Sequence, residues 1–151
     1  MEENVYQIRQ IETGKEIQSI LFAFSSYFPN LTNGEQQIMQ LAKKLEQFGI
    51  VIAAEIEGTI IGFAAFYAND QIDRIAYLTL IAVNESVRGQ HIGTILLDNV
   101  VELCLTNGMK TILLEVRKKN SGAILFYEKL GFKKTGKGTL NTEYMTKQLQ
   151  E

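Results

Sequence analysis

The stretch VRGQHIGT, residues 87–94, places an arginine and two glycines between two apolar runs. This pattern predicts a loop that follows a strand ending at Val83 and precedes a helix beginning near Ile92. The first amides of a helix have no internal hydrogen-bond partners, and the helix dipole adds partial positive charge there. The loop could therefore bind an anion.

The residue types in this loop favour a large anion with several oxygens. Gly89 and Gly93 carry no side chain and let such an anion approach the backbone. The guanidinium of Arg88 suits phosphate, and Thr94 adds a hydroxyl in the first helical turn. Together they form a possible diphosphate site, although a plain helix-entry turn could use the same residues. The pattern fits neither the Walker motif nor the dinucleotide fingerprint.

Glu115 is a second candidate for chemistry, because it is the only charged residue in the apolar run TILLEV, residues 111–116. We expect a central strand here and therefore a buried carboxylate. Burial would raise the pKa of that carboxylate, as a general base working near neutral pH requires. The alternative is a glutamate at a strand end that pairs with Arg117 or Lys118.

The elements that must position these residues follow from hydrophobic periodicity and from turn signals. We expect strands over residues 5–9, 50–58, 59–70, 73–83, 111–116, 132–135 and 144–146, and helices over 14–26, 34–48, 92–105 and 121–130. Asn120 or Ser121 can cap the last helix, and Glu57-Gly58 is a hairpin signal. The order predicts one α/β (mixed α+β) domain over residues 1–151, with a mixed central sheet of six to seven strands and helices on both faces.

Composition excludes several classes of function. The formal net charge of −2, with no lysine or arginine cluster beyond RKK at residues 117–119, argues against a nucleic-acid partner. No apolar run approaches about 18 residues, so we expect no membrane span. The acidic N-terminus is unlike a signal peptide, and the lone Cys104, expected in the core, fits a reducing cytoplasm. With His91 as the only histidine, no metal site of the usual kind is expected.

The loop motif and the segment LLEVRKKNSGAILFYEKLGF, residues 113–132, together resemble the GCN5-related N-acetyltransferase (GNAT) family. The family's loop pattern is R/Q-x-x-G-x-G/A, and Arg88 and Gly93 fit its two ends. His91 stands where the middle glycine usually falls. Histidine tolerates a left-handed backbone better than most residues, so we expect the loop to keep its shape. The resemblance covers residues 50–135, and the first 48 residues match only in element order.

The resemblance implies the GNAT-like acyl-CoA N-acyltransferase fold and acetyl-CoA as cosubstrate. It implies that the pantetheine arm pairs with the backbone of the strand before the loop, and that Asn120 touches the arm from the other side. The implied cofactor-binding residues are Ile81, Ala82, Val83, Arg88, Gly89, Gln90, His91, Ile92, Gly93, Thr94, Asn120, Ala123 and Phe126.

The resemblance also implies direct acetyl transfer to an amine, with Tyr127 donating a proton or hydrogen bond to the leaving thiolate. Glu115 matches the base of a ribosomal-protein-acetylating branch of the family. Other relatives carry their base on the preceding strand, where this chain has Tyr77, which cannot easily fill that role. A water relay is a third possibility.

The acceptor is the least determined part of the reaction. Tyr27, Phe28 and Asn30 are expected to line its pocket. A small amine, such as an amino-sugar derivative, is the leading candidate, and a protein N-terminus is the alternative in the same enzyme class. A non-catalytic acyl-CoA-binding module is the third hypothesis. The oligomeric state stays open between monomer and homodimer.

Overall fold

A computed structural model describes residues 6–29, 31, 34–89 and 91–150 of the chain. Its strands are β1 (Gln7–Ile11), β2 (Ile50–Ile56), β3 (Thr59–Tyr67), β4 (Ile75–Val83), β5 (Thr111–Arg117), β6 (Lys133–Gly138) and β7 (Thr142–Gln148). Its helices are α1 (Gly14–Ala23), α2 (Glu35–Phe48), α3 (Ile92–Thr106) and α4 (Ser121–Lys129), with 3-10 turns η1 (Ser25–Tyr27) and η2 (Glu85–Val87). The predicted element order is confirmed.

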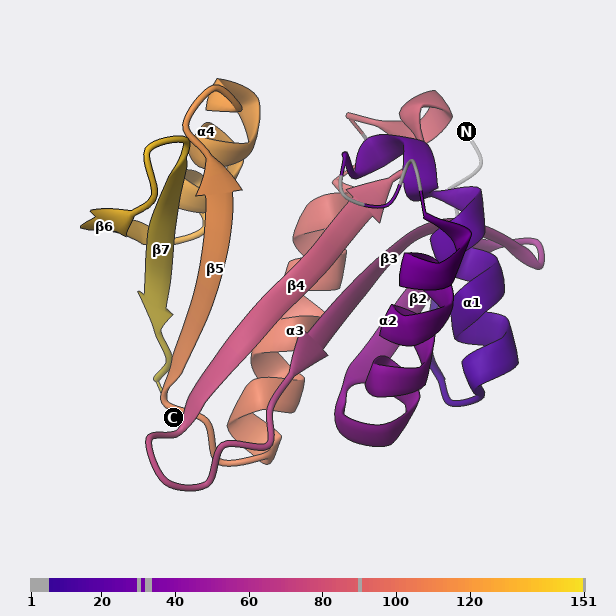
Figure 1. The fold of residues 1–151 in the computed structure, drawn as a ribbon, viewed down its shortest axis with the longest axis horizontal. Helices are drawn as coiled ribbons and strands as arrows, with labels where there is room; N and C mark the ends of the chain where they lie inside the picture. Colours follow the sequence, from indigo (N-terminus) through magenta and orange to yellow (C-terminus); the bar gives the residue numbers. More distant parts are fainter. Residues whose placement is uncertain (1–5, 30, 32–33, 90, 151) are drawn as a thin grey trace.

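The strands form one mixed sheet in the order β1-β2-β3-β4-β5-β7-β6 (Figure 1). Every neighbouring pair is antiparallel except β4 and β5, which run parallel. The parallel pair requires a crossover, and α3 supplies it between the two strands. The predicted mixed sheet with helices on both faces is therefore confirmed.

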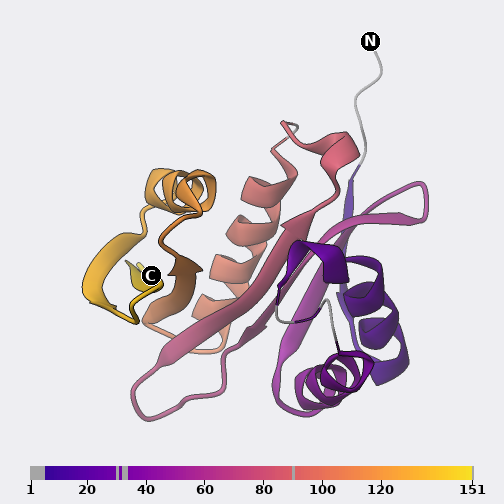
Figure 2. The same cartoon turned by 45° about the horizontal axis from the view of Figure 1, so that its top comes forward.

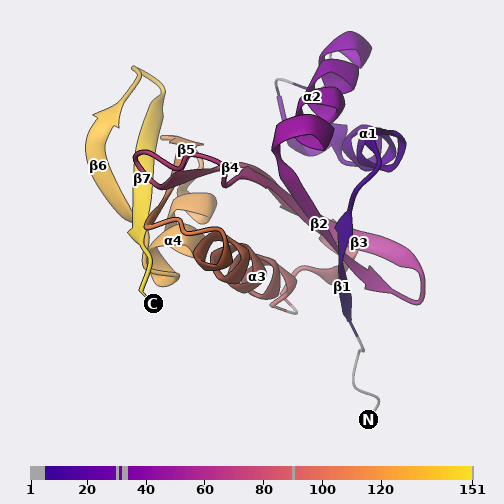
Figure 3. The same ribbon diagram turned by 90° about the horizontal axis from the view of Figure 1, so that it is seen from below.

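Helices cover the two faces of the sheet, and each face has its own apolar core (Figure 3). Side chains of α1 and α2 pack with β2, β3 and the second half of β4 on one face. On the other face, α3 and Ile124 of α4 pack with β2 to β5, Phe132 and Met145 of β7. The layer formed by α1 and α2 does not extend over β5 and β7, so on this face no described helix covers these two strands (Figure 3).

Several element boundaries differ from the expected ones by one to three residues, and two of these differences lie in the first helix and the first strand. The helix expected over 14–26 ends at Ala23 and continues as the separate turn η1. The reason lies in packing, because Phe24 turns into the core and contacts Phe63 with ring centroids 5.2 Å apart. The first strand is shifted by two residues, to Gln7–Ile11, and pairs there with β2.

No helix among the described residues is long and apolar enough to cross a membrane.

Cys104 lies in the core on α3 with no exposed surface, as expected, and burial raises the pKa of its thiol from about 9 to about 12. Between these two pH values the thiol keeps its proton in the folded state and loses it in the unfolded state. The free energy of unfolding must therefore fall as pH rises through this window, by up to about 1.4 kcal/mol per pH unit. We expect Cys104→Ala to lose this contribution, so that urea unfolding between pH 9 and pH 11 gives a shallower decline than in the wild type. Equal declines in the wild type and in Cys104→Ala would contradict the raised pKa of the Cys104 thiol.

Candidate active site

The centre of the sheet opens where β4 and β5 separate (Figures 1 and 2). The two strands pair only over Ile75–Tyr77 and Thr111–Leu113. Beyond this point β5 continues alongside β7, while β4 continues to Val83 with β3 as its strand neighbour. One edge of the second half of β4 therefore has no strand beside it.

A bulge in β4 lies at the start of this open edge. Leu78 pairs with Phe66 and Leu80 pairs with Ala65, so Thr79 between them has no partner in the register. The bulge also reverses the strand's faces, because Leu78 packs toward α3 and Leu80 packs toward α1 and α2. The Thr79 hydroxyl is buried and has no hydrogen-bond partner among the described residues.

The orientation of the backbone shows which polar groups face the open edge. The amide of Asn84 donates to Ile61 O at 2.7 Å, toward β3. Backbone groups of successive strand residues alternate in direction, so those of Val83 and Ile81 point away from β3 and those of Ala82 point toward it. The Val83 carbonyl accordingly accepts from Nε of Arg88 at 3.4 Å. Ile81 and Val83 are thus the residues whose backbone can pair with a bound chain.

The loop after β4 contains two residues with a left-handed backbone and one glycine in a close contact. Gly89 and His91 have positive φ, 89° and 63°, and His91 occupies the left-handed region as the N-cap of α3. His91 therefore has the left-handed backbone that the sequence analysis expects it to tolerate. At Gly93 a Cβ would lie 3.2 Å from Phe126 Cζ, so this glycine lets α3 and α4 approach each other closely. Gln90 lies outside the described residues.

Helix α4 contributes the opposite wall. Asn120 is its N-cap, and Oδ1 accepts from the amide of Ala123 at 3.1 Å, which leaves the amide nitrogen to donate elsewhere. The ring of Tyr127 packs between Phe126 and Phe132, with centroids 5.4 and 5.5 Å away. Burial raises the pKa of the Tyr127 hydroxyl to about 12.

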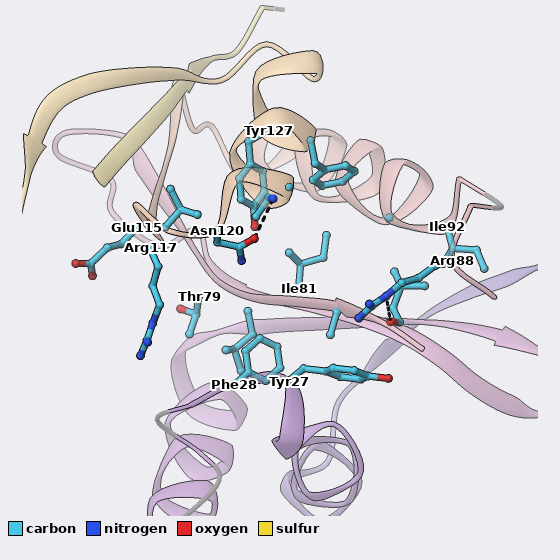
Figure 4. Close-up of a pocket in the computed structure, with 18 of the residues that line it drawn as sticks. Tyr27, Phe28, Thr79, Ile81, Arg88, Ile92, Glu115, Arg117, Asn120 and Tyr127 are labelled. Atoms are coloured by element: carbon cyan, nitrogen blue, oxygen red, sulfur yellow. Dashed lines mark hydrogen bonds between the residues drawn. The ribbon is translucent and has the colours of Figure 1, made fainter. Parts of the chain in front are cut away.

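These elements enclose one cleft of about 1120 Å³. Figure 4 shows Tyr127 and Asn120 on one side of β4, and Tyr27 and Phe28 on the other. All the predicted site residues that the structure describes line it, namely Ile81, Ala82, Val83, Arg88, Gly89, His91, Ile92, Gly93, Thr94, Glu115, Asn120, Ala123, Phe126 and Tyr127. Asn30 lies outside the described residues.

Several lining residues were missed in the sequence, and three of them illustrate why. Thr79 carries no sequence signal, because the pattern of apolar and polar residues does not reveal a bulge until the pairing of β3 with β4 is known. Leu41 follows the helical periodicity of α2 and reads as an ordinary core position, yet it lines the cleft. Thr142 is brought to the cleft by the pairing of β7 with β5, and nothing near it in the sequence indicates a site.

The expected burial of Glu115 is wrong. Its side chain is exposed, although it lies on a central strand. It points to the same side of the sheet as α1 and α2, but these helices do not reach over β5. No ion pair joins it to Arg117 or Lys118 among the described residues. Instead, Oε2 accepts from the Thr142 hydroxyl at 2.6 Å, which fixes the carboxylate at the rim of the cleft.

Tyr77 lies near this carboxylate, on the last residue of β4 that pairs with β5. Its hydroxyl has a raised pKa, first through burial and then through the negative charge of Glu115. Glu115 also lies directly opposite Tyr144 in the register of β5 and β7. Glu115 is the only carboxylate among the described residues that line the cleft.

Comparison with known proteins agrees with this geometry. A model of the acetyltransferase (GNAT) family matches residues 16–132. The [ribosomal protein bS18]-alanine N-acetyltransferase of Salmonella typhimurium is 38% identical over 69 residues, which cover 46% of this chain and 47% of that protein. The chain spans about half the length of the curated relatives it matches.

Solved structures share the fold over nearly the whole chain. Ard1 from Thermoplasma volcanium superposes with a TM-score of 0.78 at 25% identity and covers 97% of this chain and 99% of that one. The protein yncA from Salmonella typhimurium, solved with its cofactor acetyl-CoA, has a TM-score of 0.73 at 16% identity and covers 97% of this chain and 95% of that one.

Proposed function

Because the chain belongs to the acetyltransferase (GNAT) family, whose cosubstrate is acetyl-CoA, we propose that its cleft transfers an acetyl group directly from acetyl-CoA to a primary amine. The observation that carries the proposal is the open edge of β4. This edge begins at the Thr79 bulge, leads into the loop at Arg88 and lies below Tyr127 in Figure 4.

The residues of the cleft suit coenzyme A along its length. Ile81 and Val83 offer the backbone groups that an amide-bearing pantetheine arm would need. The amides that begin α3, with the guanidinium of Arg88, would hold the diphosphate. Asn120 can donate its free amide hydrogens to the arm from α4. Phe126 and Ala123 supply the apolar surface between these polar ends.

Acetyl-CoA supplies the reactive thioester, and the chain supplies hydrogen-bond donors to the charges that develop on it. Backbone amides on the open edge of β4 can donate to the oxygen that becomes negative when the amine attacks. Tyr127 then donates to the leaving sulfur. With a pKa of about 12 its hydroxyl is a weaker acid than an ordinary thiol, whose pKa is about 8.5. Tyr127 therefore acts as a hydrogen-bond donor to the thiolate rather than as a source of a fully transferred proton.

Glu115 is our candidate for the group that receives the proton of the amine. Its carboxylate is oriented by Thr142 and lies in the cleft lining, with one oxygen not engaged by that hydroxyl. Its contribution rests on its position and negative charge at the rim of the cleft. A water molecule held between Tyr77 and Glu115 could relay the same proton, since the negative charge of Glu115 lies close enough to raise the pKa of Tyr77.

Two acceptors fit the cleft. A small amine, such as an amino-sugar derivative, would be expected in an enclosed pocket with several acidic groups. Among the described residues the lining has a single carboxylate, exposed at the rim, rather than the several acidic groups expected for a small amine. The similarity to the bS18-alanine N-acetyltransferase also supports a protein N-terminus as the acceptor. We therefore favour the amine of a protein N-terminus and retain the small amine as the second candidate.

Release of free thiol from acetyl-CoA, measured against a panel of amines, tests the proposal. The panel contains glucosamine, an alkyl amine, a peptide with a free N-terminal alanine, and the same peptide with a blocked N-terminus as matched control. We expect thiol release with the free peptide and none with the blocked one. Release with glucosamine alone would assign the small-amine function. Coenzyme A binding without release with any amine would leave a binding module and overturn catalysis.

A further inference from the structure

Tyr27 lies in the N-terminal part of the chain, before the cofactor motifs, yet its side chain contacts the loop that follows β4. It is part of η1, and its hydroxyl accepts a hydrogen bond from the amide of Glu85 at 3.2 Å. The guanidinium carbon of Arg88 lies 5.3 Å from the centroid of the Tyr27 ring. One side chain thus touches both ends of the turn from Glu85 to Arg88.

These contacts restrict the arginine that would meet the diphosphate. Arg88 is exposed and would otherwise sample many rotamers. Here Nε donates to the Val83 carbonyl while the ring of Tyr27 lies beneath the guanidinium. Figure 4 shows Arg88 extended above Tyr27, over the end of β4. A cation held near its binding position loses less entropy when its ligand arrives.

Tyr27 is itself held in place by the fold. Its ring packs against Phe24 with centroids 5.7 Å apart, and Phe24 is buried against Phe63 of β3. The turn is held from the other side by Asn84, whose Oδ1 accepts from the amide of Ser86. Tyr27 therefore links the apolar core that contains Phe24 to the loop that follows β4.

We infer that Tyr27 is a positioning residue for the diphosphate loop, acting through Glu85 and Arg88, rather than only a wall of the acceptor pocket. The inference rests on the proposed coenzyme A site. It follows that Tyr27 sets the affinity for ligands that carry a diphosphate. Ligands that carry only the pantetheine arm should not depend on it.

Calorimetry with coenzyme A on two variants tests this inference. Tyr27→Phe removes the hydroxyl that accepts from Glu85 and keeps the ring, and we expect Kd to rise about threefold. Tyr27→Leu also removes the ring beneath Arg88, and we expect Kd to rise about tenfold. Tyr67→Phe is the matched control, because Tyr67 lies on β3 outside the cleft lining and its hydroxyl has no partner among the described residues. It should leave Kd unchanged.

A donor without the diphosphate separates positioning from a general structural effect. With acetyl-pantetheine in place of acetyl-CoA, KM should be the same in wild type and Tyr27→Phe. Equal weakening toward both donors, or an unchanged Kd in both variants, would overturn the inference. A change in the KM of the amine alone would assign Tyr27 to the acceptor side. If Tyr27→Leu does not fold, Tyr27→Phe with the two donors decides. Wild-type protein that binds no coenzyme A would refute the proposed function itself.

Discussion

Tyr127→Phe should lower kcat about 100-fold and leave the Kd for coenzyme A within twofold of wild type. The ring of Tyr127 provides the packing between Phe126 and Phe132, and phenylalanine preserves it. The substitution removes only the hydroxyl, whose proposed partner is a thiolate that exists late in the reaction. A group that interacts with the transition state more strongly than with the bound ground state affects kcat rather than affinity.

The pH dependence of this variant follows from the raised pKa of Tyr127. A group that acts as a donor works while it is protonated and fails as pH rises through its pKa in the folded protein. Since burial raises that pKa to about 12, Tyr127 stays a donor throughout the range from pH 6 to pH 10. The ratio of wild-type to variant kcat should therefore be constant over this range.

Single-turnover rates and coenzyme A calorimetry across this pH range provide the measurement. Tyr67→Phe serves as control for loss of a tyrosine hydroxyl outside the cleft. A ratio that declines between pH 7 and pH 9 would mean that Tyr127 ionises there and that its burial does not protect it. A kcat near the wild-type value would remove Tyr127 from the reaction altogether.

The sequence was sufficient to predict the parts of the site that depend on local signals. The helix entry at Ile92, the cap at Asn120 and the spacing from Asn120 to Tyr127 each follow from a few neighbouring residues. The left-handed histidine is also a local property, because a loop that needs positive φ accepts histidine at a modest cost. The structure brings these residues into one cleft because the loop from β4 to α3 and the helix α4 both border the gap where β4 and β5 separate.

Properties that depend on neighbouring strands could not be predicted. An apolar run predicts a buried strand. Whether Glu115 itself is buried depends on which elements cover the face of β5 to which its side chain points. The N-terminal helices pack over β1 to β3 and the second half of β4 and stop there, so Glu115 is exposed. Leu114 points to the other face and is buried in the core beside α3. The contact of Tyr27 with Arg88 joins residues 61 positions apart, and no periodicity carries that information. The partnership of Thr142 with Glu115 depends in the same way on the pairing of β5 with β7.

The second large effect is expected at this exposed carboxylate. Glu115→Gln keeps an oxygen that can accept from Thr142 and removes the negative charge and the ability to take a proton. We expect kcat with the amine acceptor to fall about 100-fold near pH 7, the size of contribution typical of a general base. The Kd for coenzyme A should not change, because Glu115 and Arg88 lie at opposite ends of the cleft in Figure 4.

The deficit of this variant should shrink as pH rises, because an amine that has already lost its proton in solution needs no base. For a protein N-terminus, whose pKa is about 7.7–8.0, the variant should recover most of its activity near pH 9. For an alkyl amine with a pKa of about 10.4 recovery would require about two more pH units. The pH at which Glu115→Gln recovers therefore reports the kind of amine as well as the role of the carboxylate.

Two further variants separate the charge of Glu115 from its orientation. Thr142→Val removes the hydroxyl that fixes the carboxylate, and we expect a loss of about threefold to tenfold, since the charge remains but its position is less restricted. Glu128→Gln, on the exposed side of α4 and outside the cleft lining, removes a charge of the same type and should leave the rates unchanged. If Glu115→Gln behaves like Glu128→Gln, the proton leaves the amine by another route. If Thr142→Val lowers kcat strongly and Glu115→Gln does not, Thr142 contacts the acceptor directly.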